Sequence, residues 1–276
     1  MKVAAYQAPY LPFGSLDAIA LIKEQLAICE TLGVEMLCCP EAIIGGLAHE
    51  SAGESPADVA FEVHSAELAD VLGPLTGTTV TVIVGFTERD RHDRIFSSAA
   101  ILANGGISAV YRKVFPGYRT IVQPGTDLHV HQRGSTVFGV MICNDIWYLE
   151  PARILSSAGA AIIFVPTNSG HVRDERQAEA LRPRGATLPI ARAVENTTTI
   201  VVADIAGSQD DRQALGCTRI IDPDGVVLAE ADESREQLVI ADVEAERRSF
   251  DPRGWDGATN PAVKDTFLEL WQAESS

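Results

Sequence analysis

The chain has 276 residues, of which 46% are hydrophobic, enough to bury a sizeable core in one large α/β domain or two small ones. Its formal net charge of −16 argues against a nucleic-acid partner, because a phosphate backbone repels an acidic protein. No apolar run approaches the roughly 18 residues of a membrane span, and Met1 leads directly into a strand pattern without signal-peptide features, so we expect no membrane partner and a cytoplasmic protein.

The first half of the chain predicts helices that alternate with short buried strands. Strands are expected at residues 3–8, 34–39, 79–86 and 95–102. One helix is expected from about Asp17 to Leu32, with Gly33 as its C-cap, and a second amphipathic helix at residues 57–72. The dipeptide Asn104-Gly105 predicts a tight hairpin into a strand at residues 107–113.

The second half of the chain predicts more hairpins and one long helical stretch. After a loop at residues 115–125, the expected elements are a hairpin at 128–142, a short helix at 151–158, a strand at 160–165, a helical stretch at 173–195 broken near Pro183 or Pro189, a strand at 197–205, a hairpin turning at 222–225 and a strand at 237–243. This mixture predicts mixed sheets covered by helices. Since no low-complexity linker divides the chain, we expect one domain over residues 1–276, with a C-terminal tail from about residue 249.

Cys143 is the cysteine whose surroundings point to chemistry. The five cysteines are odd in number and show no CxxC spacing, and the histidines form no HxxxH pair, so we expect reduced thiols and neither a metal nor another cofactor. Cys143 directly follows a predicted buried strand and is itself followed by Asn144 and Asp145. Taken alone, such a cysteine is more often a small buried hydrophobe. As a nucleophile it needs a base or a cation nearby, because only the thiolate attacks carbon.

Two other residues occupy the same local setting and provide those partners. Glu41 follows the strand predicted before Pro40, and Lys113 ends another predicted strand. Loops at strand ends on one edge of a sheet converge on a cleft. A carboxylate there can take the proton of a thiol, and an ammonium can stabilise the thiolate and an oxyanion. Alone, Glu41 would be a solvated turn residue and Lys113 an ordinary strand-end charge; together with Cys143 they suit attack on an amide or nitrile carbon.

These three residues resemble the Glu-Lys-Cys triad of the nitrilase superfamily, the carbon–nitrogen hydrolases. The resemblance runs in order from about residue 3 to about residue 248. It is carried by Cys39-Pro40-Glu41, Tyr111-Arg112-Lys113-Val114, Gly139-Val-Met-Ile-Cys143-Asn-Asp145, Gln123-Pro124-Gly125, Arg192-Ala-Val-Glu195-Asn196 and Ile221-Asp-Pro-Asp-Gly225.

The resemblance implies an αββα four-layer sandwich that forms a homodimer or a higher homo-oligomer. It also implies cleavage of the non-peptide C–N bond of a small amide or carbamoyl substrate through a cysteine acyl-enzyme, without a cofactor. Glu41 would be the general base and acid, Lys113 the oxyanion stabiliser and Cys143 the nucleophile. The backbone N–H of Asn144 would be a second oxyanion donor.

The chain departs from the family pattern in one place, and other readings stay open. Many amidases of the family carry a second glutamate between the lysine and the Pro-Gly, but residues 115–123 contain no acid, and Tyr118 lies nearest to that position. In true nitrilases the cysteine is typically followed by Trp-Glu, so Asn144 after Cys143 favours the amidase branch. The further candidates for the pocket or its support are Tyr118, Asn144, Glu150 and Asn168. Two alternatives are a catalytically degenerate binding module on the same fold and an N-acyltransferase.

Overall fold

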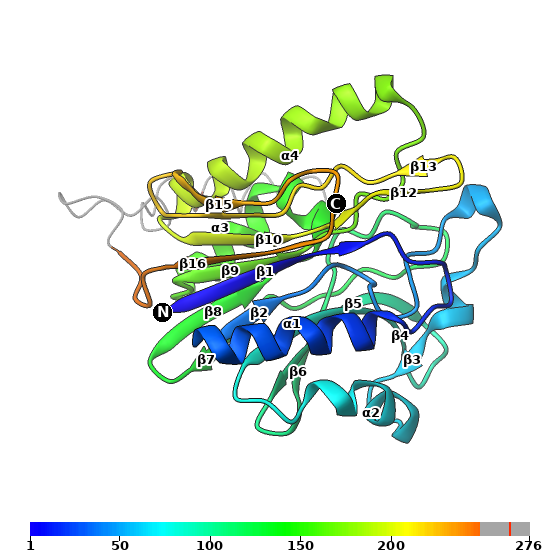
Figure 1. The fold of residues 1–276 in the computed structure, drawn as a ribbon, viewed down its shortest axis with the longest axis horizontal. Coiled ribbons are helices and arrows are strands. Elements are labelled where there is room, and N and C mark those ends of the chain that lie inside the picture. The colour runs from blue at the N-terminus through cyan, green and yellow to red at the C-terminus, as the bar shows by residue number, and fades with distance from the viewer. Residues whose placement is uncertain (249–264, 266–276) are drawn as a thin grey trace.

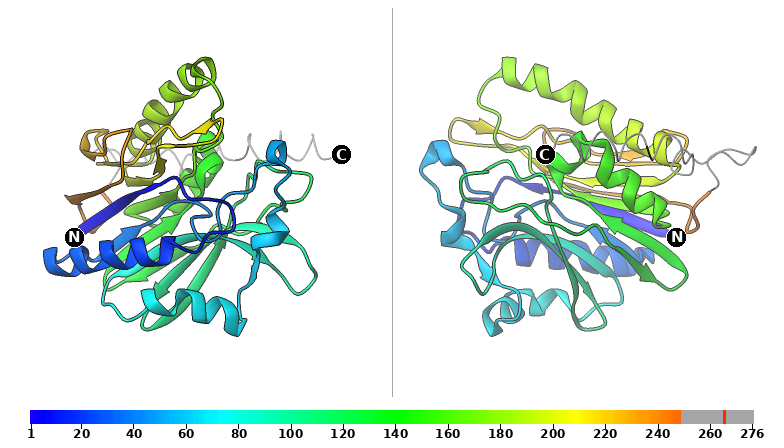
Figure 2. Two further views of the ribbon diagram at one scale, coloured as in Figure 1. Left: turned by 45° about the vertical axis from the view of Figure 1, so that its right-hand side comes forward. Right: turned by 180° about the vertical axis from the view of Figure 1, so that it is seen from behind.

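The computed structural model describes residues 1–248 and residue 265, which form two mixed β-sheets packed face to face between two layers of helices (Figure 1). Figure 2 shows the helices on the two outer faces, with α1 (Ala18–Leu32) and α2 (Ala66–Leu72) on one side and α3 (Leu149–Ser157) and α4 (Glu175–Asn196) on the other. The structure therefore has the αββα layering expected from the sequence. The tail expected from about residue 249 lies outside the described residues.

The first sheet has strand order β11-β1-β2-β4-β5-β6, with β16 also beside β1 and β3 also beside β4. Its central strands β1, β2 and β4 run parallel, and β4, β5 and β6 run antiparallel. Helices α1 (Ala18–Leu32) and α2 (Ala66–Leu72) cover its outer face. The strands are β1 (Lys2–Pro9), β2 (Met36–Cys38), β3 (Phe61–Glu62), β4 (Thr81–Arg89), β5 (Ile95–Ala103), β6 (Gly106–Arg112), β11 (Ile205–Ala206) and β16 (Gln237–Asp242).

The second sheet has strand order β15-β14-β10-β9-β8-β7, and β8, β9 and β10 run parallel. Helices α3 (Leu149–Ser157) and α4 (Glu175–Asn196) cover its outer face. The strands are β7 (Val130–Arg133), β8 (Thr136–Val140), β9 (Ile162–Pro166), β10 (Thr199–Ala203), β14 (Arg219–Ile221) and β15 (Val227–Glu230). The 3₁₀ segments are η1 (Glu50–Ala52), η2 (Pro56–Val59), η3 (Gly73–Leu75) and η4 (Cys143–Trp147), and β12 (Ser208–Gln209) pairs with β13 (Arg212–Gln213).

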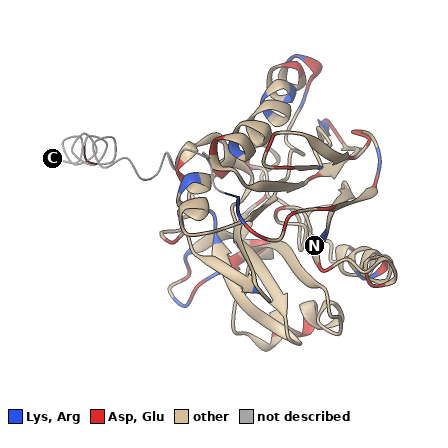
Figure 3. Cartoon of the chain, turned by 90° about the vertical axis from the view of Figure 1, so that its left-hand side faces the viewer, with Lys and Arg blue, Asp and Glu red and all other residues tan. Residues whose placement is uncertain are grey.

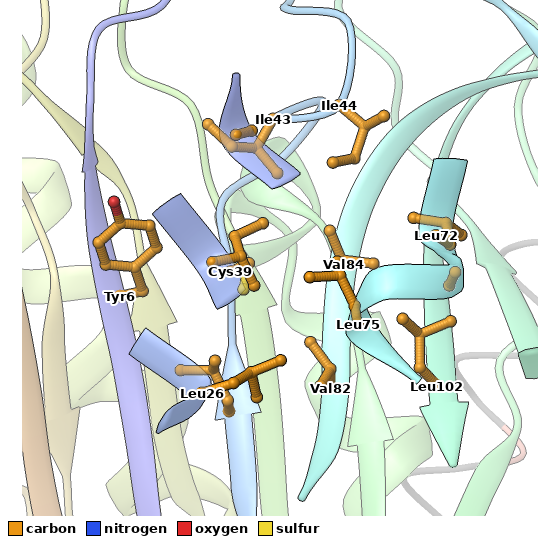
Figure 4. Packing of buried hydrophobic residues seen from close by; sticks show 14 of the residues in the cluster. Tyr6, Leu26, Cys39, Ile43, Ile44, Leu72, Leu75, Val82, Val84 and Leu102 are labelled. Carbon is orange, nitrogen blue, oxygen red and sulfur yellow. The ribbon is translucent and has the colours of Figure 1, made fainter. Parts of the chain in front are cut away.

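The layers follow from the alternation of side chains along fully buried strands. In β1, Val3 and Ala5 face the second sheet, whereas Ala4 and Tyr6 face α1. Successive side chains of a strand point to opposite faces, so a strand with apolar residues at every position must be covered on both sides. The first sheet thus has an inner core against the second sheet and an outer core against its helices. Figure 4 shows the outer core, where residues from the first sheet meet those of the helices that cover it.

Two element predictions are wrong, and one small hairpin was not predicted. The helix expected at residues 57–72 is η2, the short strand β3 and the helix α2, because Phe61 pairs with the C-terminal end of β4. The helical stretch expected to break near Pro183 or Pro189 is the single helix α4, which contains both prolines. The hairpin β12–β13 had no counterpart in the sequence prediction.

Charged residues lie mainly on loops and helices, and the strands are largely uncharged (Figure 3). Among the described residues, no helix combines the length and apolarity needed to cross a membrane. No group of three or more His, Cys, Asp or Glu side chains in this part of the chain is arranged to hold a metal ion.

Candidate active site

A cavity of about 710 Å³ opens where strands of both sheets end, and Glu41, Lys113 and Cys143 line it together. Glu41 lies three residues after the end of β2, Lys113 directly follows β6, and Cys143 begins η4 after β8. Residues that are 72 and 102 positions from Glu41 in the chain thus meet it at one site, as convergence of strand ends predicts.

Glu41 and Lys113 form a buried ion pair in this cavity. The ammonium Nζ of Lys113 donates to Oε1 of Glu41 at 2.7 Å, and Ser97 Oγ donates to the same oxygen at 2.8 Å. Glu41 is 1% exposed and Lys113 is 5% exposed. Burial by itself lowers the pKa of Lys113, but the negative charge of Glu41, with that of Asp145, outweighs it and raises the pKa. Lys113 therefore carries its positive charge at all physiological pH values.

The backbone around both charges is held by close packing and hydrogen bonds. Asn168 Nδ2 donates to the carbonyl of Glu41 at 3.1 Å. At Gly85 of β4, a Cβ would lie 2.5 Å from the carbonyl oxygen of Pro40, so the turn that carries Glu41 fits only against a glycine. The amide of Gly125 donates to the carbonyl of Lys113 at 2.8 Å, and a Cβ there would meet the carbonyl of Arg112 at 2.3 Å. The backbone positions of Glu41 and Lys113 therefore each depend on close contact with a glycine.

Cys143 has a strained backbone and a neutral thiol. Its φ of 43° places a non-glycine residue in the left-handed region, a conformation that persists only when the surrounding structure enforces it. Burial, reinforced by the charge of Glu41, raises the pKa of the Cys143 thiol to about 12, although Lys113 and a hydrogen bond from the Asn168 backbone oppose the rise. The thiol therefore keeps its proton at neutral pH, and attack by sulfur requires a base to remove it.

Asp145 links the lysine strand to the cysteine turn, a role that the sequence did not indicate. Its buried carboxylate accepts hydrogen bonds from the Tyr111 hydroxyl at 2.7 Å and from the backbone amides of Phe115 and Ile142 at 2.8 Å each. Burial raises the pKa of Asp145, and Lys113 and these donors oppose the rise. The carboxylate thus fixes the residues immediately before Cys143 relative to those on both sides of Lys113.

Ser97 is a second residue of the site that the sequence analysis missed. It is followed by Ser98, and the two serines interrupt an otherwise apolar strand, which is the signal that could have drawn attention to them. Because neighbouring side chains of a strand point to opposite faces, Ser97 donates to Glu41, whereas Ser98 donates to buried Glu88 at 2.6 Å. Arg112, the residue before Lys113, also pairs with Glu88.

The remaining predicted site residues differ in where they lie. Tyr118, Asn144 and Asn168 line the cavity with the triad, and Asn144 Nδ2 donates to the carbonyl of Phe115 at 3.0 Å. Glu150 lies on α3, outside the residues that line the cavity. Among the described residues, the lining carboxylates other than that of Glu41 belong to Glu50 on η1 and to Asp204.

The sequence of the chain matches a known protein family and proteins of other organisms. The family model described as carbon-nitrogen hydrolase matches residues 2–251. A nitrilase of Pyrococcus abyssi is 29% identical over 227 residues, which cover 81% of this chain and 80% of that protein. A glutamine-dependent NAD(+) synthetase of Xanthomonas campestris is 28% identical over 267 residues, 92% of this chain, but the match spans only 46% of the synthetase.

Solved structures share the fold at lower identity. An amidase of Nesterenkonia sp. AN1, in a form that shows acrylamide added to its active-site cysteine, superposes with a TM-score of 0.78 at 20% identity, over 98% of this chain and 99% of that one. Nit3 of Saccharomyces cerevisiae, a member of branch 10 of the nitrilase superfamily, superposes with a TM-score of 0.75 at 21% identity, over 98% and 93% of the two chains. At these identities the likeness shows a common fold.

Proposed function

The chain belongs to the carbon–nitrogen hydrolase family, and we propose that it is a thiol hydrolase that cleaves the non-peptide C–N bond of a small amide or carbamoyl substrate. The observation that carries the proposal is the buried pair of Glu41 and Lys113 in one cavity with the thiol of Cys143. A carboxylate, an ammonium and a thiol are the groups that acyl transfer through a thioester requires.

In the proposed first half-reaction, Glu41 takes the thiol proton while the Cys143 sulfur bonds to the carbonyl carbon. The negative charge that develops on the carbonyl oxygen is stabilised by Lys113 and by the backbone N–H of Asn144. Both hydrogen bonds to the Glu41 side chain within the described residues use Oε1, which leaves Oε2 for the proton. Glu41 then gives that proton to the departing nitrogen, the C–N bond breaks, and a thioester and ammonia or an amine result.

In the second half-reaction, Glu41 removes a proton from water, and the resulting hydroxide equivalent attacks the thioester carbon. The tetrahedral intermediate collapses with cleavage of the C–S bond, and the sulfur leaves with a proton from Glu41. The carboxylic acid product departs, and the enzyme returns to its starting state. The raised pKa of Cys143 supports this sequence, because a neutral thiol is both the reactant of the first step and the product of the last.

An amide is favoured over a nitrile by the residues next to the nucleophile. Cys143 is followed by Asn144 and Asp145 rather than by the Trp-Glu typical of nitrilases. The similar proteins include a nitrilase, an amidase and a synthetase that is named as glutamine-dependent. Glutamine is itself an amide. Two of these three names therefore refer to amides, which agrees with the sequence around Cys143.

The proposal predicts that the wild-type protein releases ammonia from members of a panel of small amides and carbamoyl compounds, measured with an enzyme-coupled assay. Cys143→Ala removes the nucleophile and is expected to reduce the rate to the uncatalysed level. Glu41→Gln removes the base and is expected to lower kcat at least about 1,000-fold, at the upper part of the range for general acid–base catalysis. Equal ammonia release by the wild type and by Cys143→Ala would refute the assignment.

Two controls make the result specific. Iodoacetamide should still alkylate Cys143 in Glu41→Gln, as read by intact mass and peptide mapping, because loss of the Glu41 charge removes one cause of the raised thiol pKa. A variant that is inactive but still alkylated has lost the base rather than the fold. Product analysis with an added amine distinguishes water from an amine as the acyl acceptor, and acyl transfer to the amine in preference to water would replace hydrolase by N-acyltransferase.

A further inference from the structure

The cationic side chains on the cavity wall differ in whether they already form an ion pair with an acidic residue. Among the described residues, three cationic side chains line the cavity: Lys113, Arg184 and Arg212. Lys113 is paired with Glu41, and Arg212 is paired with Glu54 at 3.3 Å. Arg184 is exposed to the cavity and to solvent and forms no ion pair or hydrogen bond within the described residues.

The histidines of the wall do not add positive charge at neutral pH. Burial and the nearby charge of Arg212 lower the pKa of His49 to about 4, and burial also lowers the pKa of His171. Asp204 accepts hydrogen bonds from Ser169 and from the backbone amides of Ile205 and Cys217, so its carboxylate is already satisfied. Within the part of the chain that the structure describes, Arg184 is therefore the unpaired cation that a ligand in the cavity can meet.

Arg184 is held in place without using its hydrogen-bond donors. Its guanidinium carbon lies 4.7 Å from the ring centroid of Trp147, the last residue of the segment that begins with Cys143. Eight residues further along α4, about 12 Å on a helix, Arg192 donates to the carbonyls of Ile146 at 3.1 Å and Trp147 at 3.3 Å. The Trp147 backbone is thus fixed to α4, and a guanidinium stacked on an indole keeps its N–H edge free for a carboxylate.

The wall around these groups is mostly apolar. A substrate with a hydrocarbon body would gain free energy by burying it there, and its two polar ends would have to find polar partners. One end, the scissile amide, is expected at Cys143; Arg184 offers a partner for the other. The apolar lining residues include Leu47, Ile146, Leu181, Pro189, Val202 and Leu215.

We propose that Arg184 is a specificity-determining residue that binds a carboxylate at the end of the substrate remote from the scissile C–N bond. The substrate class is then the amido acid, an apolar chain with an amide or carbamoyl group at one end and a carboxylate at the other. This inference rests on the proposed function, since it names the substrate of that site. The exposed carboxylate of Glu50 on the same cavity wall gives the competing possibility, a substrate that carries an ammonium group.

The test compares amides of matched length that differ in charge at the remote end. Succinamate carries a carboxylate, its methyl ester and butyramide are neutral, and 4-aminobutyramide carries an ammonium. We expect kcat/KM to be highest for succinamate. Arg184→Gln should lower kcat/KM for succinamate about 10- to 100-fold, as for loss of a hydrogen bond to a charged group, and change it less than about twofold for the neutral amides.

Two further variants control for charge and for helix perturbation. Arg184→Lys keeps the charge but loses the planar pair of donors, so it should retain part of the preference. Arg176→Gln changes another exposed arginine of α4 that does not line the cavity, and it should leave all four rates unchanged. A wild-type protein without preference for succinamate, a preference for 4-aminobutyramide, or an equal effect of Arg184→Gln on charged and neutral amides would overturn the inference.

Failure of the proposed function is distinguishable from failure of this inference. If the wild-type protein hydrolyses none of the amides, the proposed function fails, and calorimetric titration of succinamate into Cys143→Ala still tests the carboxylate site. Binding that weakens at least 10-fold in Cys143→Ala/Arg184→Gln supports the site. Equal binding by the two variants, or no binding to Cys143→Ala, overturns it.

Discussion

Ser97 gives the carboxylate of Glu41 a second hydrogen bond, from an uncharged donor. Lys113 and Ser97 both donate to Oε1, so the two bonds fix the rotation of the carboxyl group and the direction of its free oxygen. Ser97→Ala leaves the Glu41 carboxylate with Lys113 as its one hydrogen-bond donor among the described residues, and the carboxylate can then turn away from the thiol. We expect kcat for amide hydrolysis to fall about 10-fold, which corresponds to about 1.4 kcal/mol in the activation barrier.

Ser98→Ala is the matched control for that substitution. It removes a hydroxyl from the same strand and also breaks a hydrogen bond to a buried glutamate, but that glutamate is Glu88, on the other face of the sheet. Both variants should lose about 1–3 kcal/mol of unfolding free energy, measured by urea denaturation. Equal kcat values for the two variants would show that Ser97 supports the fold and not the base.

The residues that bring chemistry were easier to infer from the sequence than those that support it. Glu41, Lys113 and Cys143 each lie within three residues of the end of a strand, a pattern that the sequence indicates, and the structure brings them to one cavity. Ser97 and Asp145 act through hydrogen bonds to residues 56 and 34 positions away. Those bonds depend on the register of strands and on loop paths, which no local pattern specifies.

At the scale of elements, the turn after β2 is fixed by its close approach to β4. A Cβ at Gly85 would lie 2.5 Å from the backbone of Pro40 and of Ala42, the residues on either side of Glu41. Gly85→Ala must therefore move this turn away from β4. We expect a loss of about 1–3 kcal/mol in unfolding free energy, as for overpacking. Because the substitution also displaces Glu41, kcat should fall more than it does in a variant that is equally destabilised but keeps Glu41 in place.

Gly106→Ala provides the comparison, since Gly106 also lies in a strand of the first sheet but has open space around its Cβ direction. It should leave kcat unchanged and alter the unfolding free energy by less than about 1 kcal/mol. A Gly85→Ala protein with wild-type kcat would mean that Glu41 does not depend on this contact for its position.

Strands and hairpins followed local patterns more closely than helices did. Asn104 and Gly105 both have positive φ, as the two-residue turn predicted from them requires, and Gly33 ends α1 in the left-handed conformation. The helix predicted at residues 57–72 failed because pairing of Phe61 with β4 outweighs its helical spacing. The helix α4 contains two prolines because packing of its buried residues, Arg192 among them, compensates for the missing hydrogen bonds.

At the scale of the whole molecule, half-buried histidines make the stability of the fold depend on pH. Burial lowers the pKa of His49 to about 4 and lowers that of His131, which lies beside the ring of Phe138. In the unfolded chain both titrate near 6.5. As pH falls below about 6.5, the unfolded state therefore binds protons that the folded state does not, and the free energy of unfolding decreases.

Two buried carboxyl groups act in the opposite direction. Burial raises the pKa of Asp145 and of Asp204, so in the folded state they bind protons at a higher pH than in the unfolded chain. Acidification therefore favours the folded state at these two positions, and the observed slope is the difference between the two effects. Replacing His49 and His131 should therefore reduce the histidine contribution and leave that of the carboxyl groups unchanged.

We expect urea denaturation to give an unfolding free energy about 1 kcal/mol lower at pH 5.5 than at pH 7.5, a value that allows for the partial solvent contact of both histidines. In His49→Gln/His131→Gln the difference should become smaller, because these two histidines no longer contribute to it, whereas His171, whose pKa burial also lowers, still does. The control is His92→Gln/His129→Gln, which changes two exposed histidines and should keep the wild-type dependence. If the control abolishes the dependence and the first variant does not, the coupling of pH to folding arises at the surface rather than from burial of His49 and His131.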